Sequence, residues 1–122
     1  MFVDLPGYGF ARVSREVRAQ WGPMIEEFLR EDEFLRLAIV ILDARRRPTS
    51  LDQMMVEWLR RFQLPFKLVA SKTDKLSGNQ RRNAVSELSK HFGVDSVVSF
   101  SAQKGDGRKE LWSRIRNAIE TP

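Results

Sequence analysis

Short apolar runs recur along this chain of 122 residues, separated by stretches in which polar and apolar positions are mixed. The runs lie at 37–43 (LAIVILD), 66–70 (FKLVA) and 96–100 (SVVSF), with a fragment of another at 2–4 (FVD). Each run is short, rich in Val, Ile, Leu and Phe, and apolar on both faces, which is typical of strands inside a parallel sheet. We therefore predict three strands and part of a fourth.

The stretches between the runs have apolar residues at helical spacing. The first stripe consists of Leu51, Met54, Met55, Trp58, Leu59 and Phe62. The second follows a capping-box pattern and consists of Ser77 and Gln80 at the start, then Val85, Leu88 and Phe92. The third consists of Leu111, Trp112, Ile115, Ala118 and Ile119. This spacing predicts three amphipathic helices.

A longer helical pattern extends over 17–29 and is interrupted by Gly22-Pro23. Proline removes one backbone hydrogen bond, so we expect a kink or a break into two helices there. Strands that alternate with helices predict a single α/β domain with a parallel sheet and right-handed crossovers. In such sheets ligands bind at the carboxyl ends of the strands, and the residues after each apolar run are therefore the candidates for chemistry.

The composition narrows the class of protein. Hydrophobic residues make up 42% and charged residues 30%, the balance of a soluble globular protein. No apolar run approaches the ~20 residues of a membrane span, and the first residues do not resemble a secretory signal. The absence of cysteine excludes disulfides, thiolate metal sites and cysteine nucleophiles. We expect a cytoplasmic protein with no membrane partner.

The net charge of +5 is unevenly distributed. Residues 1–35 hold four Lys/Arg against seven Asp/Glu, whereas residues 36–122 hold seventeen against nine. A basic surface attracts phosphate polymers, so this asymmetry favours an RNA partner. The alternative is that the charges are solvated helix faces, and charge alone does not decide between the two.

Three short motifs follow the apolar runs. After the first comes Asp4-Leu5-Pro6-Gly7. An Asp that leaves a strand into a glycine turn can reach Mg²⁺ through water, and the Gly lets its N–H approach a terminal phosphate. Taken alone, this motif is also an ordinary turn.

The second motif, Ser71-Lys72-Thr73-Asp74, follows the run at 66–70. A carboxylate that accepts two N–H bonds from the edge of guanine distinguishes it from adenine, and the aliphatic stem of a lysine can lie against a purine ring. The alternative is an ordinary helix N-terminal turn. The third motif, Ser101-Ala102, follows the run at 96–100; its small residues let a backbone N–H reach the purine carbonyl, although a tight loop would look the same.

The three motifs together favour one guanine-nucleotide site, because each follows an apolar strand in the same order. The sequence resembles the Ras-like GTPases, whose third, fourth and fifth G motifs match Asp4-x-x-Gly7, Ser71-Lys72-x-Asp74 and Ser101-Ala102. Longer strings resemble the EngB (YihA/YsxC) family of ribosome-assembly GTPases: DLPGYGFA from Asp4, DARRRPTSLDQMMVEWL from Asp43, KTDKLS from Lys72 and FSAQKGDGRKELW from Phe100. Ser71 departs from the usual Asn or Thr, but its hydroxyl can still bridge loops.

The resemblance implies an α/β P-loop NTPase (Ras-like) fold with three layers and a mostly parallel sheet. It also implies GTP/GDP and Mg²⁺ as ligands, slow hydrolysis, assembly of the large ribosomal subunit and a link to cell division and septation. Asp4 would bind Mg²⁺, Pro6 and Gly7 would contact the γ-phosphate side, and the base would be held by Ser71, Lys72, Asp74, Ser101 and Ala102. The Arg45-Arg46-Arg47 run is a candidate for contact with rRNA, or else a solvated loop.

The sequence contains no G-x-x-x-x-G-K-[ST] motif to hold the phosphates. We therefore expect residues 1–122 to be the C-terminal portion of one G domain, lacking its N-terminal strands, with weak GTP binding and no hydrolysis. The Ras-like fold would place a missing strand beside 37–43, and the unpaired edge would favour rearrangement or a strand-exchanged or edge-paired homo-oligomer.

Two other interpretations stay open. One is a non-catalytic α/β module that binds RNA or protein through its basic face. The other is a flavodoxin-like receiver, which would need an acidic cluster after its first strand and fits the glycine turn after Asp4 poorly.

Overall fold

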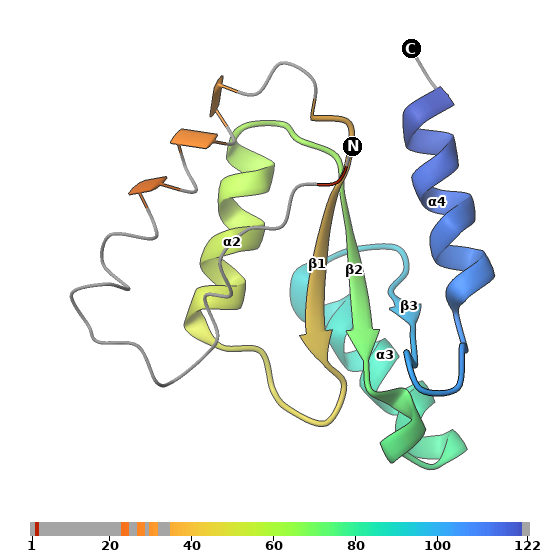
Figure 1. The fold of residues 1–122 in the computed structure, drawn as a ribbon. Coiled ribbons are helices and arrows are strands. Elements are labelled where there is room, and N and C mark those ends of the chain that lie inside the picture. Colours follow the sequence, from red (N-terminus) through yellow and green to blue (C-terminus); the bar gives the residue numbers. More distant parts are fainter. Residues whose placement is uncertain (1, 3–22, 25–26, 29, 32–34, 121–122) are drawn as a thin grey trace.

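The computed structural model describes residues 2, 23–24, 27–28, 30–31 and 35–120 (Figure 1). Its elements are β1 (Ala38–Asp43), α2 (Ser50–Arg61), β2 (Phe66–Ser71), the 3-10 turn η1 (Thr73–Lys75), α3 (Gly78–Phe92), β3 (Val98–Ser99) and α4 (Arg108–Glu120). The three strands predicted within 35–120 and the three helices after them are confirmed. The predicted strand fragment at 2–4 and the break at Gly22-Pro23 fall mostly outside the described residues.

The described strands form one parallel sheet in the order β1-β2-β3. The register pairs Ala38 with Phe66 and Asp43 with Ser71, so that β1 and β2 end together. β3 is shorter than the run predicted at 96–100, although Phe100 N–H still donates to the carbonyl of Ala70 at 2.9 Å. The loops that leave the three strands therefore meet at one edge of the sheet.

Two capping boxes define where α2 and α3 begin. The predicted one is confirmed: the Ser77 hydroxyl accepts from Gln80 N–H, and Ser77 N–H donates to the Gln80 side chain. A second box, which was not predicted, joins Thr49 and Asp52 at the start of α2. Each box satisfies two backbone N–H groups at the helix start.

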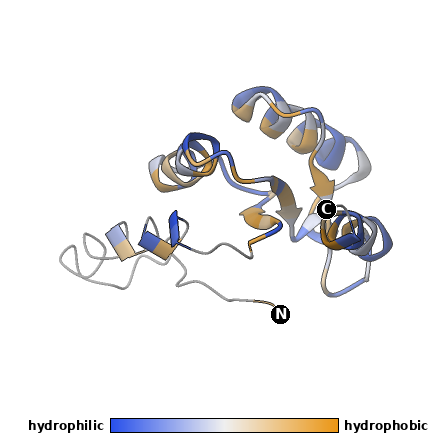
Figure 2. Ribbon diagram, turned by 90° about the horizontal axis from the view of Figure 1, so that it is seen from above, coloured by the Kyte–Doolittle hydropathy of each residue, from blue (hydrophilic) through white to orange (hydrophobic). Residues whose placement is uncertain are grey.

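The main core lies between one face of the sheet and helices α2 and α3. Its buried members are Val40, Leu42, Ala44, Met55, Val56, Leu59, Leu68, Ala70, Leu88, Phe92 and Val97. Figure 2 shows the apolar sides of these helices turned toward the strands, with α4 on the other side of the sheet. Helices on both faces of a parallel sheet make the three-layer α/β architecture that the sequence predicted.

The burial of the strands agrees with the prediction in β2 and differs from it in β1. In β2, Leu68, Val69 and Ala70 are all buried, as expected for a strand covered on both faces. In β1, however, Ile41 is 66% exposed, because among the described residues β1 pairs only with β2 and α4 lies beside β3.

Helix α4 is also less covered by its neighbours than α2 and α3 are. None of its residues is buried, and Ile119 is 64% exposed. The second face of the sheet is thus covered far less than the first. Within the part of the chain that the structure describes, no helix is long and apolar enough to cross a membrane.

A candidate guanine-recognition site at the strand ends

The fold brings together the predicted residues that follow β2 and β3. Ser71 ends β2, Lys72 and Asp74 lie in the next turn, and Ser101 begins the loop after β3. Asp4, Pro6 and Gly7, including the predicted Mg²⁺ ligand Asp4, lie outside the described residues. Among the described residues, no cluster of three or more His, Cys, Asp or Glu side chains could hold a metal ion.

Lys72 has a left-handed backbone conformation, with φ 59° and ψ 33°. This conformation is unfavourable for a residue with a Cβ, by roughly 1–2 kcal/mol. It is held by the next residue: the backbone N–H and the hydroxyl of Thr73 both donate to the carbonyl of Phe100, at 3.3 and 3.0 Å. Because Thr73 is fully buried, the turn is anchored to the loop after β3, and strained backbone held in this way is common at functional sites.

Asp74 and Ser101 form the centre of the site. The Ser101 hydroxyl donates to Asp74 Oδ1 at 3.0 Å, and Ser101 is fully buried. The Asp74 side chain is only 9% exposed, and its Oδ2 lies 3.8 Å from Lys75 Nζ at the surface. A carboxylate has about four acceptor positions, so these contacts leave Asp74 able to accept further N–H groups.

The loop after β3 is closed by its own hydrogen bonds. Ser101 N–H donates to the carbonyl of Asp106 at 2.9 Å, and Gly105 N–H donates to the carbonyl of Ser101 at 2.8 Å. The Ser101 hydroxyl also accepts from Lys104 N–H at 3.1 Å. Ala102 is an exposed small residue in this closed turn. The loop that holds Ser101 against Asp74 therefore has a small, exposed side chain at its next position.

Ser71, the first residue of the second sequence motif, joins two strands. Its hydroxyl donates to the carbonyl of Leu42 at 3.0 Å, and its carbonyl accepts from Ala44 N–H at 3.0 Å. The hydroxyl therefore joins the ends of β2 and β1, whereas the sequence led us to expect a bridge between loops.

Sequence reasoning missed Asp43 as a residue of this edge, although it ends an apolar run directly before an arginine. Its carboxylate accepts from the Arg45 side chain, and this pairing, together with a smaller contribution from Lys72, lowers its pKa to about 2. Asp43 is therefore an anion at any physiological pH.

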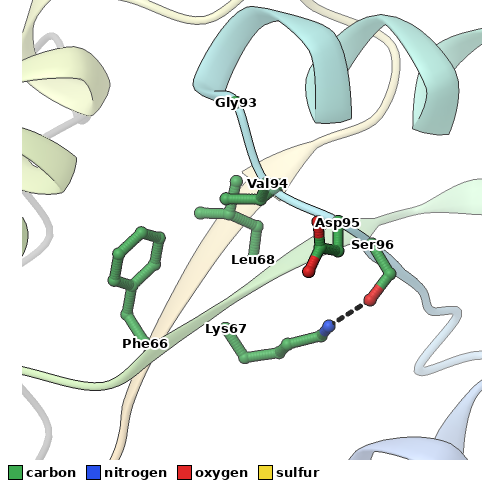
Figure 3. A pocket seen from close by; sticks show the side chains of 7 residues that line it. All are labelled: Phe66, Lys67, Leu68, Gly93, Val94, Asp95 and Ser96. Carbon is green, nitrogen blue, oxygen red and sulfur yellow. Dashed lines mark hydrogen bonds between the residues drawn. The ribbon is translucent and has the colours of Figure 1, made fainter.

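A separate hollow of about 300 Å³ lies at the opposite edge of the sheet, where β2 begins (Figure 3). It is lined by Phe66, Lys67, Leu68, Gly93, Val94, Asp95 and Ser96. The Lys67 ammonium donates to the Ser96 hydroxyl. Burial, with the positive charge of Arg114, lowers the pKa of Lys67. Because this hollow is at the amino end of β2, it is no part of the site formed by the strand ends.

Comparison with known proteins identifies relatives over nearly the whole chain. No family model matches it. The "Probable GTP-binding protein EngB" of Geobacter sulfurreducens is 44% identical over 117 residues, which cover 94% of this chain and 57% of the relative. A protein with the same description from Koribacter versatilis is 41% identical over 121 residues, which cover 99% of this chain and 60% of the relative.

The chain is similar to EngB proteins over nearly its whole length. It spans about three-fifths of the length of the curated EngB proteins it matches. A solved structure described as a probable GTP-binding protein engB has a TM-score of 0.80 at 22% identity, covering 95% of this chain and 76% of that one. Era in complex with MgGDPNP and nucleotides 1506-1542 of 16S ribosomal RNA has a TM-score of 0.73 at 20% identity, covering 98% of this chain and 39% of that one. The fold of this chain is that of the P-loop GTPases.

Proposed function

We propose that this chain recognises guanine in GTP and GDP through the turn after β2 and the loop after β3. The observation that carries the proposal is the Asp74–Ser101 pair: a nearly buried carboxylate, held by one hydroxyl and paired with Lys75 at the surface, with acceptor positions left for further donors. Guanine offers two N–H groups on one edge, and adenine does not. The left-handed turn at Lys72 and the anchored Thr73 fix the carboxylate, so that little ordering is needed when the base binds.

The remaining contacts extend the proposal. Lys72 would lie along the purine, Ser71 would brace the loop, and the backbone at Ser101 and Ala102 would meet the purine carbonyl. Asp4 would bind Mg²⁺, with Pro6 and Gly7 near the γ-phosphate. In this proposal residues 1–122 correspond to the C-terminal portion of one Ras-like G domain, which runs from the third to the fifth G motif.

The affinity for GTP and GDP would depend mainly on the contacts that the protein makes with the base. The 122-residue sequence contains no G-x-x-x-x-G-K-[ST] motif, whose backbone N–H groups and lysine cradle phosphates in related folds. We therefore propose that this sequence by itself binds GTP and GDP weakly and does not hydrolyse GTP. The titration that tests the proposal must reach millimolar nucleotide.

We also propose that ribosomal RNA of the large subunit is the partner, in a cytoplasmic role in ribosome assembly. The positive charge of residues 36–122 and the description of Era in complex with 16S ribosomal RNA, a small-subunit RNA, support an RNA partner in general. The large subunit is what the resemblance to EngB implies. In the Arg45-Arg46-Arg47 run, Arg45 is paired with Asp43, whereas the side chain of Arg46 is 80% exposed. Arg46 and the exposed Arg47 are therefore better placed than Arg45 to meet phosphates.

The Asp74→Asn variant tests guanine recognition. Loss of a charge-assisted hydrogen bond costs about 1.5–3 kcal/mol, so GDP binding should weaken roughly 10- to 150-fold. An asparagine amide accepts one hydrogen bond and donates another, which matches xanthine, so XDP should bind Asp74→Asn better than GDP does. The measurement is an NMR titration with GDP, ADP and XDP, in which the wild type should prefer GDP.

The matched control is Asp95→Asn, which makes the same change of charge at the opposite edge of the sheet. It should bind GDP as the wild type does. Equal binding of ADP and GDP by the wild type, or an Asp74→Asn protein with unchanged GDP affinity, would contradict the proposed base site.

A further inference from the structure

The Asp43 carboxylate lies where the end of β1 meets the base-recognition turn. Its Oδ1 accepts from the backbone N–H of Arg45 at 2.9 Å and from Arg45 Nε at 3.1 Å. Its Oδ2 accepts from Arg45 Nη2 at 2.9 Å. Such a bidentate contact between a carboxylate and a guanidinium fixes the orientation of both side chains.

The same carboxylate faces the turn after β2. Asp43 Oδ2 lies 3.7 Å from Lys72 Nζ and 3.9 Å from Arg46 Nε. The backbones on either side are joined as well, through the hydrogen bonds between Ser71 and β1 described above. Asp43 is 20% exposed, whereas Lys72 is 58% exposed, so the better-buried anion sets the position and the lysine follows it.

Two of the three cations paired with Asp43, Arg45 and Lys72, also lie near a second carboxylate, that of Asp74. The pKa of Arg45 is raised mainly by its hydrogen bond with Asp43, and to a smaller extent by the negative charge of Asp74. Lys72 is two residues from Asp74 in the same turn. Without Asp43, both cations would be attracted to Asp74 and would compete with the N–H groups of guanine for its oxygens.

We propose that Asp43 is a positioning residue for guanine recognition, which holds Arg45 and Lys72 beside the end of β1 and so keeps Asp74 open to the base. With its ammonium held at Asp43, the aliphatic stem of Lys72 is also kept extended beside the turn, where a purine can lie against it. Asp43 touches no nucleotide in this arrangement and acts through the two cations. The proposal rests on the proposed guanine site.

The test is the GDP affinity of Asp43→Asn, measured by NMR titration beside the Asp95→Asn control. Both variants raise the net charge by one, which by Coulomb attraction alone would favour an anionic nucleotide. We expect Asp43→Asn to bind GDP about three- to tenfold more weakly than wild type, a few-fold effect as expected for partly exposed ion pairs. Asp95→Asn should match the wild type. Asp43→Glu, which keeps the charge, should stay within about twofold of wild type.

A mutant-cycle comparison separates positioning from a structural role. In a background that carries Arg45→Ala, Arg46→Ala and Lys72→Ala, none of the three cations paired with Asp43 remains, so adding Asp43→Asn should change GDP affinity by less than about twofold. An equal loss in that background would overturn the positioning role, as would an Asp43→Glu loss as large as that of Asp43→Asn.

The outcomes also distinguish this inference from the function on which it rests. If the wild type binds GDP and Asp43→Asn binds it equally well, the positioning role fails and the guanine site stands. If the wild type shows no preference for guanine nucleotides, the proposed function fails and the positioning role fails with it. The unfolding midpoint of each variant, measured in urea, ensures that affinities are compared between folded proteins.

Discussion

Gly107 is the position where a single methyl group should most disturb the candidate site. Its φ is +82°, and a Cβ added there would lie 2.0 Å from the carbonyl oxygen of Ser99, 3.0 Å from the carbonyl carbon of Ser99 and 3.2 Å from the Cα of Phe100. All three atoms are backbone, so no side chain can rotate away. The Gly107→Ala variant must therefore move the loop away from β3.

The size of the effect follows from the contacts that such a movement breaks. The left-handed conformation costs an alanine about 1–2 kcal/mol. Shifting the loop also strains two hydrogen bonds, from Ser101 N–H to the Asp106 carbonyl and from Leu111 N–H to the Gly107 carbonyl, each 2.9 Å long. At about 1 kcal/mol for each bond, the expected loss is about 3–4 kcal/mol. That is a large part of the 5–15 kcal/mol that typically stabilises a domain.

Gly105 in the same loop provides the matched control. Its φ is +79°, but no atom lies within 4 Å of an added Cβ. Gly105→Ala should therefore lower the free energy of unfolding only by the cost of the left-handed backbone conformation, about 1–2 kcal/mol. The assay is urea unfolding followed by far-UV circular dichroism, with the free energies extrapolated to water. If the two variants agree within about 0.5 kcal/mol, the close approach to Ser99 does not determine stability and the reasoning is wrong.

Two further predictions concern β1. The folded-state pKa of Asp43 is about 2, below its ordinary value of 3.8, so its stabilising contribution is present above about pH 4 and is lost as the pH falls toward 2. Unfolding midpoints measured from pH 5 to 2 should decline less steeply for Asp43→Asn than for the wild type. Equal declines in the two proteins would refute this prediction. We also propose that β1 forms the expected edge-paired homo-oligomer: Ile41→Lys should lower the mass measured by light scattering with little change in stability, and equal masses would contradict pairing there.

The strands and helices within 35–120 could be predicted because their signals are local. The run at 66–70 is apolar without a break, and the stripe through Met55 and Leu59 has a helical period, so each segment favours one conformation before any tertiary contact forms. Ser77 and Gln80 lie three positions apart, and their capping box needs only the helix that they begin. Because ligands bind at the carboxyl ends of strands in such sheets, Asp74 and Ser101 could then be predicted as candidate site residues.

Burial could not be predicted in the same way, because it depends on neighbours distant in sequence. Ile41 and Val69 are in register on adjacent strands, yet Val69 is buried and Ile41 is 66% exposed. The difference arises because β2 has a strand on each side, whereas β1 has one among the described residues. Trp112 has the spacing of a core residue and is 40% exposed for a related reason, since none of the described elements packs closely enough on α4 to bury it.

The sequence by itself determined the order of strands and helices, the residues that we propose to read a guanine base and the resemblance to EngB, because these reside in local periodicity and short motifs. Only the tertiary structure decided that Asp43 belongs to the same edge as Lys72, twenty-nine positions away. The parallel register of β1 and β2 makes them neighbours, and charge attraction then orders the side chains. Pairing of this kind has no local signal, since it depends on where two strands end in space.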